Sequence, residues 1–230
     1  MPNRQLGPPV DTTPRSLPVR TNIQGQYCVL EPLHRRHAAD LWRAAAIGTQ
    51  AGDESWDYLA YGPFADVAAM AHHVADLATQ QDRVAWAVRP LSTGMASGWL
   101  TFLDIQPKNA AIEIGNIWFG PAMQRTRAST EAIFLALRLA MDDLGYRRMV
   151  WKCNSLNAPS RRAAERLGFT YEGTLRGHMV VKGRHRDSAF FSIQDMEWPR
   201  CRDAFVVWLD PANFAPDGTA LHGLAELRRG

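Results

Sequence analysis

Residues 118–132 read WFGPAMQRTRASTEA, and this stretch decides the fold. It passes from a predicted strand at 111–119, through a polar turn, into an apolar helix predicted at 128–144. The first turn of a helix presents backbone N–H groups without internal acceptors, at the positive end of the helix dipole. The stretch therefore predicts an anion-binding turn of the kind that holds phosphate groups.

Hydrophobic periodicity and turn residues predict further elements on both sides of this stretch. The predicted strands are 27–33, 84–89, 97–103, 111–119, 148–153, 170–176 and 188–195, and the predicted helices are 34–47, 65–79, 128–144, 157–167 and 202–209. No internal repeat or linker divides them, so we expect one α/β domain of the α+β type. We place it at 26–198, between a flexible Pro-rich leader at 1–25 and a helical or frayed tail at 199–230.

The composition is that of an ordinary soluble globular protein. The 230 residues are 46% hydrophobic and 21% charged, with a formal net charge of +3 that is spread along the chain. This weak charge argues against a nucleic-acid partner, and no apolar run approaches the roughly 20 residues of a membrane span. Because Cys28, Cys153 and Cys201 lack zinc-site or disulfide spacing, we expect no metal and a cytoplasmic location.

One carboxylate stands in an otherwise apolar strand. The period of two places Glu113 on the face away from Ile112 and Ile114. On the same face as Glu113 we expect Ile117 and Phe119. Burial there would raise the pKa of the carboxyl group toward the working pH, as a general base requires. The alternative is a salt bridge to an arginine at the rim of the sheet.

Several short motifs follow one another in an order that is typical of one enzyme superfamily. They are Glu113-Ile114-Gly115, Trp118-Phe119-Gly120-Pro121, Gln124 to Ala132, Leu144-Gly145-Tyr146-Arg147-Arg148, Asn157-Ala158-Pro159-Ser160-Arg161, Leu167-Gly168-Phe169, Glu172-Gly173 and Arg184-His185-Arg186-Asp187-Ser188. In the order and spacing of these motifs, residues 27–198 resemble the GNAT-superfamily N-acetyltransferases. The resemblance is closest to the branch that contains the ribosomal-protein-alanine N-acetyltransferases.

The resemblance implies a GNAT fold, with a mixed, mostly antiparallel sheet of about six or seven strands flanked by helices. The sheet would be splayed between strands 111–119 and 148–153, where acetyl-CoA, the co-substrate, enters. The implied activity is direct transfer of an acetyl group to a primary amine, either a protein N-terminal α-amine or a small-molecule amine. A non-catalytic acyl-CoA sensor or assembly module of the same fold is the alternative, and a homodimer is left open.

The resemblance also assigns cofactor contacts. The superfamily's pyrophosphate loop, Gln/Arg-x-x-Gly-x-Gly/Ala, falls on Gln124, Arg127 and Ser129, so neither glycine position is glycine here. The implied cofactor-binding residues are Ile117, Trp118 and Phe119 at the thioester carbonyl, Gln124, Arg125, Thr126, Arg127, Ala128, Ser129 and Thr130 at the pyrophosphate, Asn157 and Ser160, and Arg162 at the 3′-phosphate. The alternative is a solvated helix cap with the Arg127 side chain in water.

A second predicted helix start carries two further candidates for the reaction. Asn157 and Pro159 are typical of a helix N-terminus. The resemblance implies that Asn157 orients the cofactor or the acceptor, and that Ser160 protonates the departing CoA thiolate. Many members use a tyrosine for that step, but the corresponding residue here is Ala164. Simple helix capping is the alternative for both Asn157 and Ser160.

Aromatic residues crowd the segment 52–64, where the superfamily places a segment that covers the acceptor. Trp56 and Tyr58 are therefore expected to contact the acceptor amine, together with Glu113. Packing within the loop is the alternative for both aromatic residues. Near the closing hairpin we expect a polar turn with a local ion pair, formed from Arg176, His178, His185 and Asp187.

Overall fold

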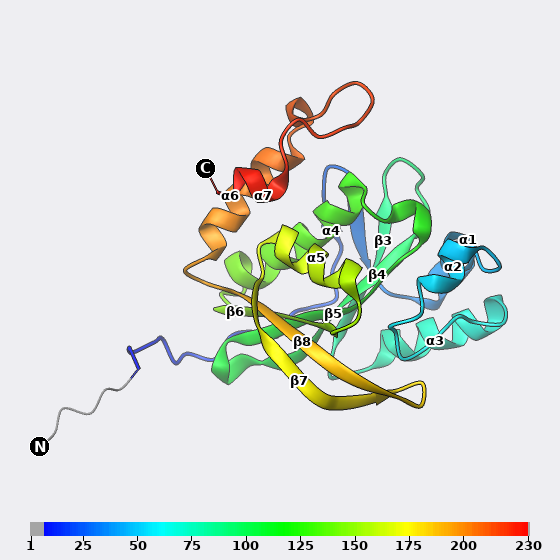
Figure 1. Ribbon diagram of the computed structural model, residues 1–230, viewed down its shortest axis with the longest axis horizontal. Coiled ribbons are helices and arrows are strands. Elements are labelled where there is room, and N and C mark those ends of the chain that lie inside the picture. The colour runs from blue at the N-terminus through cyan, green and yellow to red at the C-terminus, as the bar shows by residue number, and fades with distance from the viewer. Residues whose placement is uncertain (1–6, 230) are drawn as a thin grey trace, which may run out of the picture.

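An eight-stranded sheet forms the centre of the computed structural model, which describes residues 7–229 (Figure 1). The strands are β1 (Ile23–Gln24), β2 (Cys28–Pro32), β3 (Val84–Pro90), β4 (Gly98–Gln106), β5 (Ala111–Phe119), β6 (Arg148–Asn154), β7 (Thr170–Val181) and β8 (Arg184–Gln194). Their order in the sheet is β1-β2-β3-β4-β5-β6-β8-β7. The predicted α/β class with a mixed sheet is confirmed, and the two-residue β1 brings the strand count above the predicted six or seven.

β5 and β6 run parallel and separate soon after they begin. Their pairing is limited to residues 111–113 with 148–150, although β5 continues to Phe119 and β6 to Asn154. The other strand pairs within residues 7–229 are antiparallel. Neighbouring strands stay paired only while they lie about 4.8 Å apart. The loss of pairing therefore marks the point where the two strands splay apart, as the resemblance implies; the unpaired side of β5 beyond this point is called the opening below.

β5 contains a bulge beside this opening. Thr101 of β4 pairs with Gly115, but Trp99 pairs with Trp118, so β5 carries one extra residue between these two pairs. Asn116 has a φ of 49°, in the left-handed region that asparagine tolerates better than most residues. The inserted residue reverses the alternation of faces in the second half of β5.

This reversal corrects one sequence-based expectation. Ile117 and Phe119 pack against the same core cluster as Ile114, and not on the face of Glu113. Trp118 belongs instead to the second core cluster, on the opposite face of the sheet. The expectation was wrong because a strict period of two does not hold across a bulge.

Helices cover both faces of the sheet (Figure 1). One face carries α4 (Arg127–Arg138), α5 (Ala158–Leu167), α6 (Trp198–Leu209) and α7 (Leu224–Leu227), and the other carries α1 (Ala38–Ala45), α2 (Gln50–Glu54) and α3 (Val67–Thr79). A π-helical turn, Leu139–Asp143, extends α4, and short 3-10 turns lie at Arg35–His37, Pro107–Asn109, Pro121–Met123 and Pro211–Asn213. The two faces therefore hold two separate hydrophobic clusters with the sheet between them.

The C-terminal segment belongs to the larger of these clusters. Phe205 and Trp208 of α6 and Leu224 of α7 are buried in the cluster that packs on α4. The hydroxyl of Tyr27 donates to the carbonyl of Leu209 at 2.8 Å, which ties α6 to the start of β2. Much of the predicted tail is thus helical and packed, and Gly230 lies outside the described residues.

Part of the predicted leader is attached to the sheet. β1 pairs with β2, although residues 23–24 belong to the leader predicted at 1–25. Trp86 Nε1 donates to the carbonyl of Thr21 at 2.9 Å. The predicted flexible leader at 1–25 is therefore anchored at its C-terminal end, and its residues 1–6 lie outside the described part of the chain.

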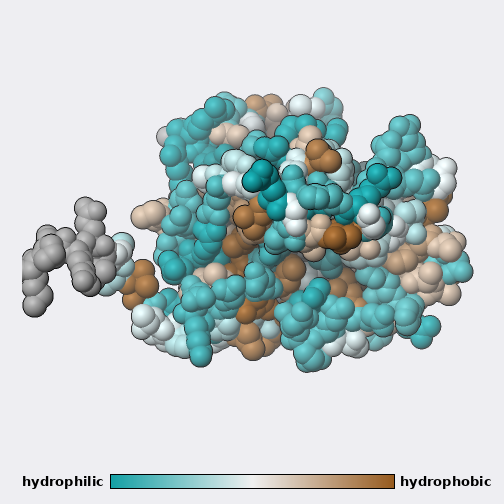
Figure 2. All heavy atoms as spheres, turned by 60° about the horizontal axis from the view of Figure 1, so that its bottom comes forward, coloured by the Kyte–Doolittle hydropathy of each residue, from teal (hydrophilic) through white to brown (hydrophobic). Residues whose placement is uncertain are grey.

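The surface is hydrophilic over most of the face shown in Figure 2, with apolar side chains gathered near its middle. Exposed apolar side chains include Leu175, Met179 and Val180 of the edge strand β7. Within residues 7–229, no helix has the length and the apolar character that crossing a membrane requires.

Candidate active site

The first turn of α4 directly follows the end of β5 and carries free backbone donors. Thr126 caps the helix, because its Oγ1 accepts from the N–H of Ser129 at 3.1 Å and its carbonyl accepts from the N–H of Thr130 at 3.2 Å. The N–H groups of residues 125–128 have no acceptor among residues 7–229. Adjacent free amides at the positive end of a helix dipole are able to hold an anion. The amides of Ser129 and Thr130, which belong to the predicted set, are already used inside the helix.

The departure from the glycine-rich loop does not distort this turn. Arg127 and Ser129, which stand where the superfamily has small residues, lie inside α4 and have helical backbones. A Cβ is accommodated at both positions. The positive φ of the turn, 61°, falls instead on Arg125. The strained backbone of the turn therefore lies two residues before the first expected glycine.

Polar side chains around the turn hold its shape. Gln124 Nε2 donates to the last carbonyl of β5 at 3.0 Å. Ser129 Oγ donates to the carbonyl of Thr126 at 2.9 Å, and Thr130 Oγ1 accepts from Arg166 Nη2 at 3.2 Å. The side chains of Gln124, Ser129 and Thr130 thus act within the protein, and an anion would meet mainly backbone.

The side chain of Arg127 does not extend into water or toward the free amides. Its guanidinium carbon lies 3.7 Å from the ring centroid of Phe214 and 5.6 Å from that of Tyr27. Stacking on two aromatic rings stabilises a guanidinium by cation–π attraction. The solvent alternative is therefore replaced by contact with the C-terminal segment, and contact of Arg127 with a phosphate stays a prediction. Arg162 is exposed on α5, and its contact with a 3′-phosphate stays a prediction.

Glu113 lies at the point where β5 and β6 stop pairing. Its side chain is buried, with the residue 4% exposed, on the face of the sheet opposite α4. A Cβ built at Gly115 would lie 2.8 Å from Glu113 Oε1, so only glycine leaves room for the carboxylate in this position. Burial raises the pKa of Glu113 above its ordinary value, which is the direction that the sequence predicts.

The partner of Glu113 is a lysine rather than the arginine that the sequence analysis considered. Lys152 of β6 places its Nζ 2.5 Å from Glu113 Oε2 and 3.6 Å from Asp104 Oδ2. Burial is the larger effect on Glu113, and the ammonium of Lys152 opposes it by lowering the pKa. The carboxyl group is therefore held between two opposed effects, with a net raised pKa. Sequence reasoning missed Lys152, although its position in an alternating strand predicts the face on which it lies.

The bulge in β5 is pinned by an aromatic side chain. The hydroxyl of Tyr61 donates to Asn116 Oδ1 at 2.5 Å, and Asn116 Nδ2 donates to Thr101 Oγ1 at 3.4 Å. Trp99 Nε1 in turn donates to the Tyr61 hydroxyl oxygen at 3.3 Å. Beyond the bulge, Trp118 and Phe119 pair with β4 on one side, and residues 117–119 have no partner strand on the side of β6 within residues 7–229. Backbone groups on that side face the opening.

Asn157 and Ser160 meet at the start of α5. Asn157 Oδ1 accepts from the N–H of Ser160 at 3.0 Å, which is the predicted cap. Ser160 Oγ accepts from Trp151 Nε1 at 3.1 Å, so the Ser160 hydroxyl hydrogen remains able to donate. Burial raises the pKa of the neighbouring Cys153, which favours a packed, protonated thiol.

The two aromatic residues predicted to contact the acceptor have different environments. Trp56 is 0% exposed and stacks on Trp118 at a centroid distance of 4.4 Å, so it belongs to the second core cluster and does not reach the surface. Tyr58 is half-buried, and its hydroxyl donates to the carbonyl of Leu156 at 3.2 Å. It bridges the aromatic segment to the loop before α5. Sequence could not separate the two, because both stand in one Gly- and Pro-rich segment.

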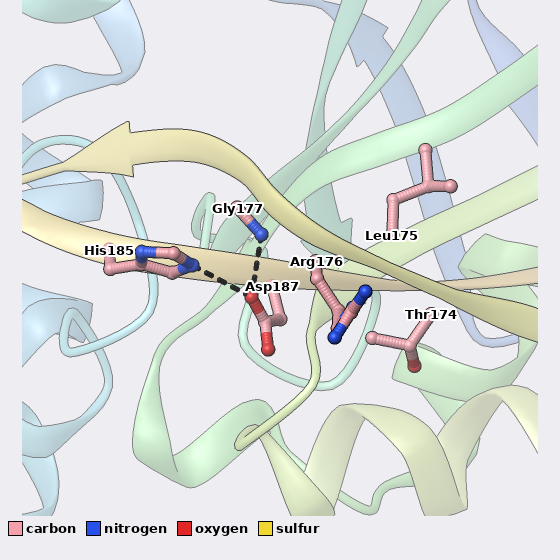
Figure 3. A pocket seen from close by; sticks show the side chains of 6 residues that line it. All are labelled: Thr174, Leu175, Arg176, Gly177, His185 and Asp187. Carbon is pink, nitrogen blue, oxygen red and sulfur yellow. Dashed lines mark hydrogen bonds and ion pairs between the residues drawn. The ribbon is translucent and has the colours of Figure 1, made fainter.

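The closing hairpin carries the predicted polar turn (Figure 3). His185 Nε2 lies 3.0 Å from Asp187 Oδ1, and the N–H of Gly177 donates to the same oxygen at 2.8 Å. An open hollow of about 700 Å³ is lined by these residues with Thr174, Leu175 and Arg176. The ion pair is local, as the sequence predicts, and lies within β8, whereas the hydrogen bond from Gly177 joins β7 to β8. Among residues 7–229, no cluster of three or more His, Cys, Asp or Glu side chains is arranged to hold a metal.

A family model and several solved structures match this chain. The model described as Acetyltransferase (GNAT) domain matches residues 28–170. The structure of a GCN5-related N-acetyltransferase from Brucella melitensis is 40% identical, with a TM-score of 0.91 over 95% of this chain and 98% of that one. A probable acetyltransferase of the GNAT family from Chromobacterium violaceum ATCC 12472 is also 40% identical, with a TM-score of 0.77 over 86% of this chain and 100% of that one.

A curated relative shares a shorter region with this chain. It is the Bacillus subtilis (strain 168) protein named "Putative ribosomal N-acetyltransferase YdaF", which is 28% identical over 108 residues. The match spans 47% of this chain and 58% of the length of that relative. The family model covers more than half of the chain, and it includes the turn before α4 and the buried Glu113. The chain therefore belongs to the GNAT acetyltransferases.

Proposed function

We propose that this protein transfers an acetyl group from acetyl-CoA to a primary amine by direct attack of the amine on the thioester. The observation that carries the proposal is the place of Glu113, a buried carboxyl group with a raised pKa where β5 and β6 separate. A carboxylate whose pKa is raised is a stronger proton acceptor than an ordinary one, as a general base requires. The opening beside it would admit the pantetheine arm of the co-substrate.

The free amides of residues 125–128 would hold the pyrophosphate of acetyl-CoA. Their N–H groups lack acceptors within residues 7–229, and they stand at the start of a 12-residue helix. A buried or ligand-facing N–H without an acceptor is costly, so an anion that satisfies these donors gains affinity. The residues present therefore fit a pyrophosphate group, although neither of the expected loop glycines is present.

The reaction would then need one base, one acid and a polarised carbonyl. Backbone groups of residues 117–119 on the open side of β5 would hold the thioester oxygen. As the amine nitrogen bonds to the acetyl carbon, Glu113 accepts its proton. The C–S bond breaks, the hydroxyl hydrogen of Ser160 goes to the thiolate, and the proton held by Glu113 returns through solvent to restore the Ser160 hydroxyl. Holding both reactants in place supplies on the order of 7–11 kcal/mol without a covalent enzyme intermediate.

A peptide N-terminus is the acceptor that this site would serve best. An α-amino group has a pKa near 7.7–8.0 and is partly neutral at pH 7, whereas a lysine amine near 10.4 must first lose a proton at a cost of about 4.6 kcal/mol. A single carboxylate already paired with Lys152 suits the easier case. The name of the ribosomal N-acetyltransferase relative points in the same direction. A small-molecule amine and the homodimer both stay predictions.

Release of free CoA tests the proposal. We expect acetyl-CoA to bind in calorimetry, and CoA to be released when peptides with a free N-terminus or small primary amines are added. Glu113→Gln should lower turnover, most of all at low pH, and should leave acetyl-CoA affinity nearly unchanged. Glu226→Gln, at an exposed carboxylate near the C-terminus, is the matched control.

Binding without turnover would support the alternative function. If acetyl-CoA binds but no amine releases CoA, the protein is an acyl-CoA sensor or assembly module and the enzyme proposal is wrong. If Glu113→Gln keeps the wild-type rate across the pH range, Glu113 is not the base.

A further inference from the structure

Arg186 of β8 is a guanidinium without a partner at the acceptor side of the sheet. Its side chain makes no hydrogen bond or ion pair within residues 7–229, and its Nε is buried without an acceptor. Burial lowers the pKa of Arg186, and the nearby Glu113 carboxylate opposes this by raising it. A desolvated cation is costly when nothing compensates its charge.

The carboxylates that could pair with Arg186 from this chain are already engaged. Asp187 points to the other face of the hairpin and is held by His185 (Figure 3). Glu113 and Asp104 share Lys152. Lys182, a cation near the hairpin tip, donates to the carbonyl of Trp56 at 2.9 Å, and Arg176 and Arg184 are exposed to solvent. Among these cations, Arg186 is the one that is partly buried and has no partner within residues 7–229.

The alternation of β8 places Arg186 on the same face of the sheet as Glu113. Ala189, Phe191 and Ile193 belong to the cluster beneath α4 and α5. Arg186 and Phe190 alternate with these residues and therefore lie on the opposite face. On that face, Lys152 Nζ lies 5.5 Å from the centroid of the Phe190 ring. The amide turn proposed for the pyrophosphate belongs to α4, which covers the opposite face. An anion at Arg186 would thus come from the acceptor and not from the CoA phosphates.

We infer that Arg186 binds a carboxylate of the acceptor, so that the protein prefers amines that carry an acidic group near the reacting nitrogen. The inference rests on the proposed function and deepens it. A guanidinium pairs with a carboxylate through parallel N–H donors, which fixes orientation as well as charge. The acceptor amine would lie at Glu113 while its acidic group lies at Arg186. The substrate class is therefore an acidic peptide N-terminus or an acidic amino acid.

Matched acceptors test this preference. Two peptides share their N-terminal residue and differ only by Asp and Glu against Asn and Gln at positions two and three, and free glutamate and glutamine form a second pair. With wild-type protein we expect kcat/KM to favour the acidic member of at least one pair by roughly ten- to hundredfold, the range of a charged hydrogen bond. The pair that shows the preference identifies the source of the carboxylate.

Variants of Arg186 then separate binding from chemistry. Arg186→Gln should remove the preference by raising KM for the acidic acceptor, with little change for the neutral one. Arg186→Lys should restore part of it. Arg184→Gln removes an exposed arginine from the same strand and should keep the preference. Circular dichroism and acetyl-CoA affinity show whether each variant is folded.

Two results would overturn the inference while the proposed function stands. Equal kcat/KM for acidic and neutral acceptors in the wild type would do so. An equal loss for all acceptors in Arg186→Gln would assign Arg186 to the common chemistry instead. If no amine releases CoA from the wild-type protein, it is the proposed function that fails.

Discussion

Lys152 Nζ lies 2.5 Å from Glu113 Oε2 across the point where two parallel strands stop pairing. The pair joins β5 to β6 on the face of the sheet opposite α4. Burial and the nearby ammonium act on the pKa of Glu113 in opposite directions, and burial is the larger effect. The proton affinity of the proposed base is therefore adjustable through a residue that does not itself accept the proton.

Removing the ammonium should move the pH dependence of the reaction. In Lys152→Met the lowering effect is lost, so the pKa of Glu113 rises further. Because the base must be deprotonated, the acid limb of kcat/KM should shift to higher pH. A pH–rate profile with one acceptor measures this shift, and Lys108→Met, at an exposed lysine outside the sheet, is the control. If the acid limb does not shift, Lys152 does not control the pKa of Glu113.

The same substitution makes a prediction for stability. Because the folded-state pKa of Glu113 is raised, this group favours the folded state below its unfolded pKa of about 4.3, and that contribution is lost as pH rises through the folded pKa. Lys152→Met should enlarge this loss. Its thermal midpoint should therefore fall below that of the wild type by more at pH 7 than at pH 5. Equal differences at both pH values would contradict the coupling.

Gly115 tests whether the position of the carboxylate matters. In Gly115→Ala the new methyl group would lie 2.8 Å from Glu113 Oε1 and 3.2 Å from Leu103 Cδ2, so the Glu113 side chain must move. We expect kcat to fall while acetyl-CoA affinity, measured by calorimetry, stays near that of the wild type. Gly7→Ala, where an added Cβ meets nothing within 4 Å, is the control. Unchanged kcat would mean that Glu113 tolerates displacement.

Tyr61 should affect catalysis through the bulge that it holds. Tyr61→Phe removes the donor to Asn116 Oδ1, and Tyr146→Phe removes a donor to the carbonyl of Ser16 at 3.1 Å. Each change should cost about 1 kcal/mol of unfolding free energy, measured by denaturant titration. Only Tyr61→Phe should also lower kcat, because only Tyr61 contacts the bulged strand. Equal kcat in both variants would reduce Tyr61 to a packing residue.

The fold was largely predictable from the sequence because turn residues and helical periodicity bound most of its short apolar strands. The strand predicted at 148–153 is β6, which ends one residue later. The predicted strands at 170–176 and 188–195 are parts of longer strands, because β7 continues past Gly177 to Val181 and β8 begins at Arg184. The predicted strand stops just before Gly177. In the structure β7 continues through Gly177, with a shift in register between Leu175 and Met179.

The site was less predictable, because its contacts depend on register and burial. Glu113 stands out as a lone carboxylate in an apolar strand, whereas its contact with Lys152 requires the pairing of β5 with β6. Nothing local marks Asn116 as the bulged residue. Trp56 is indistinguishable in sequence from an exposed aromatic residue, since its burial is set by Trp118, 62 positions further along the chain.

Substitutions of Arg127 can distinguish cofactor binding by its backbone N–H from binding by its side chain. Its guanidinium stacks on Phe214, whereas its N–H is one of the free donors of the turn. Arg127→Ala should therefore cost about 0.5–1 kcal/mol of stability and leave acetyl-CoA affinity nearly unchanged. Arg127→Pro removes the N–H as well. Proline suits this first helical position, and the preceding Thr126 already has an extended backbone with a ψ of 167°.

Acetyl-CoA affinity should therefore fall roughly tenfold or more in Arg127→Pro, the loss expected for one hydrogen bond to a charged group. Calorimetry on the two variants measures the difference, and circular dichroism confirms that α4 is retained. Equal affinities would show that this amide does not contact the cofactor. A comparable loss in Arg127→Ala would mean instead that the guanidinium leaves Phe214 and binds phosphate, as the superfamily resemblance first implied.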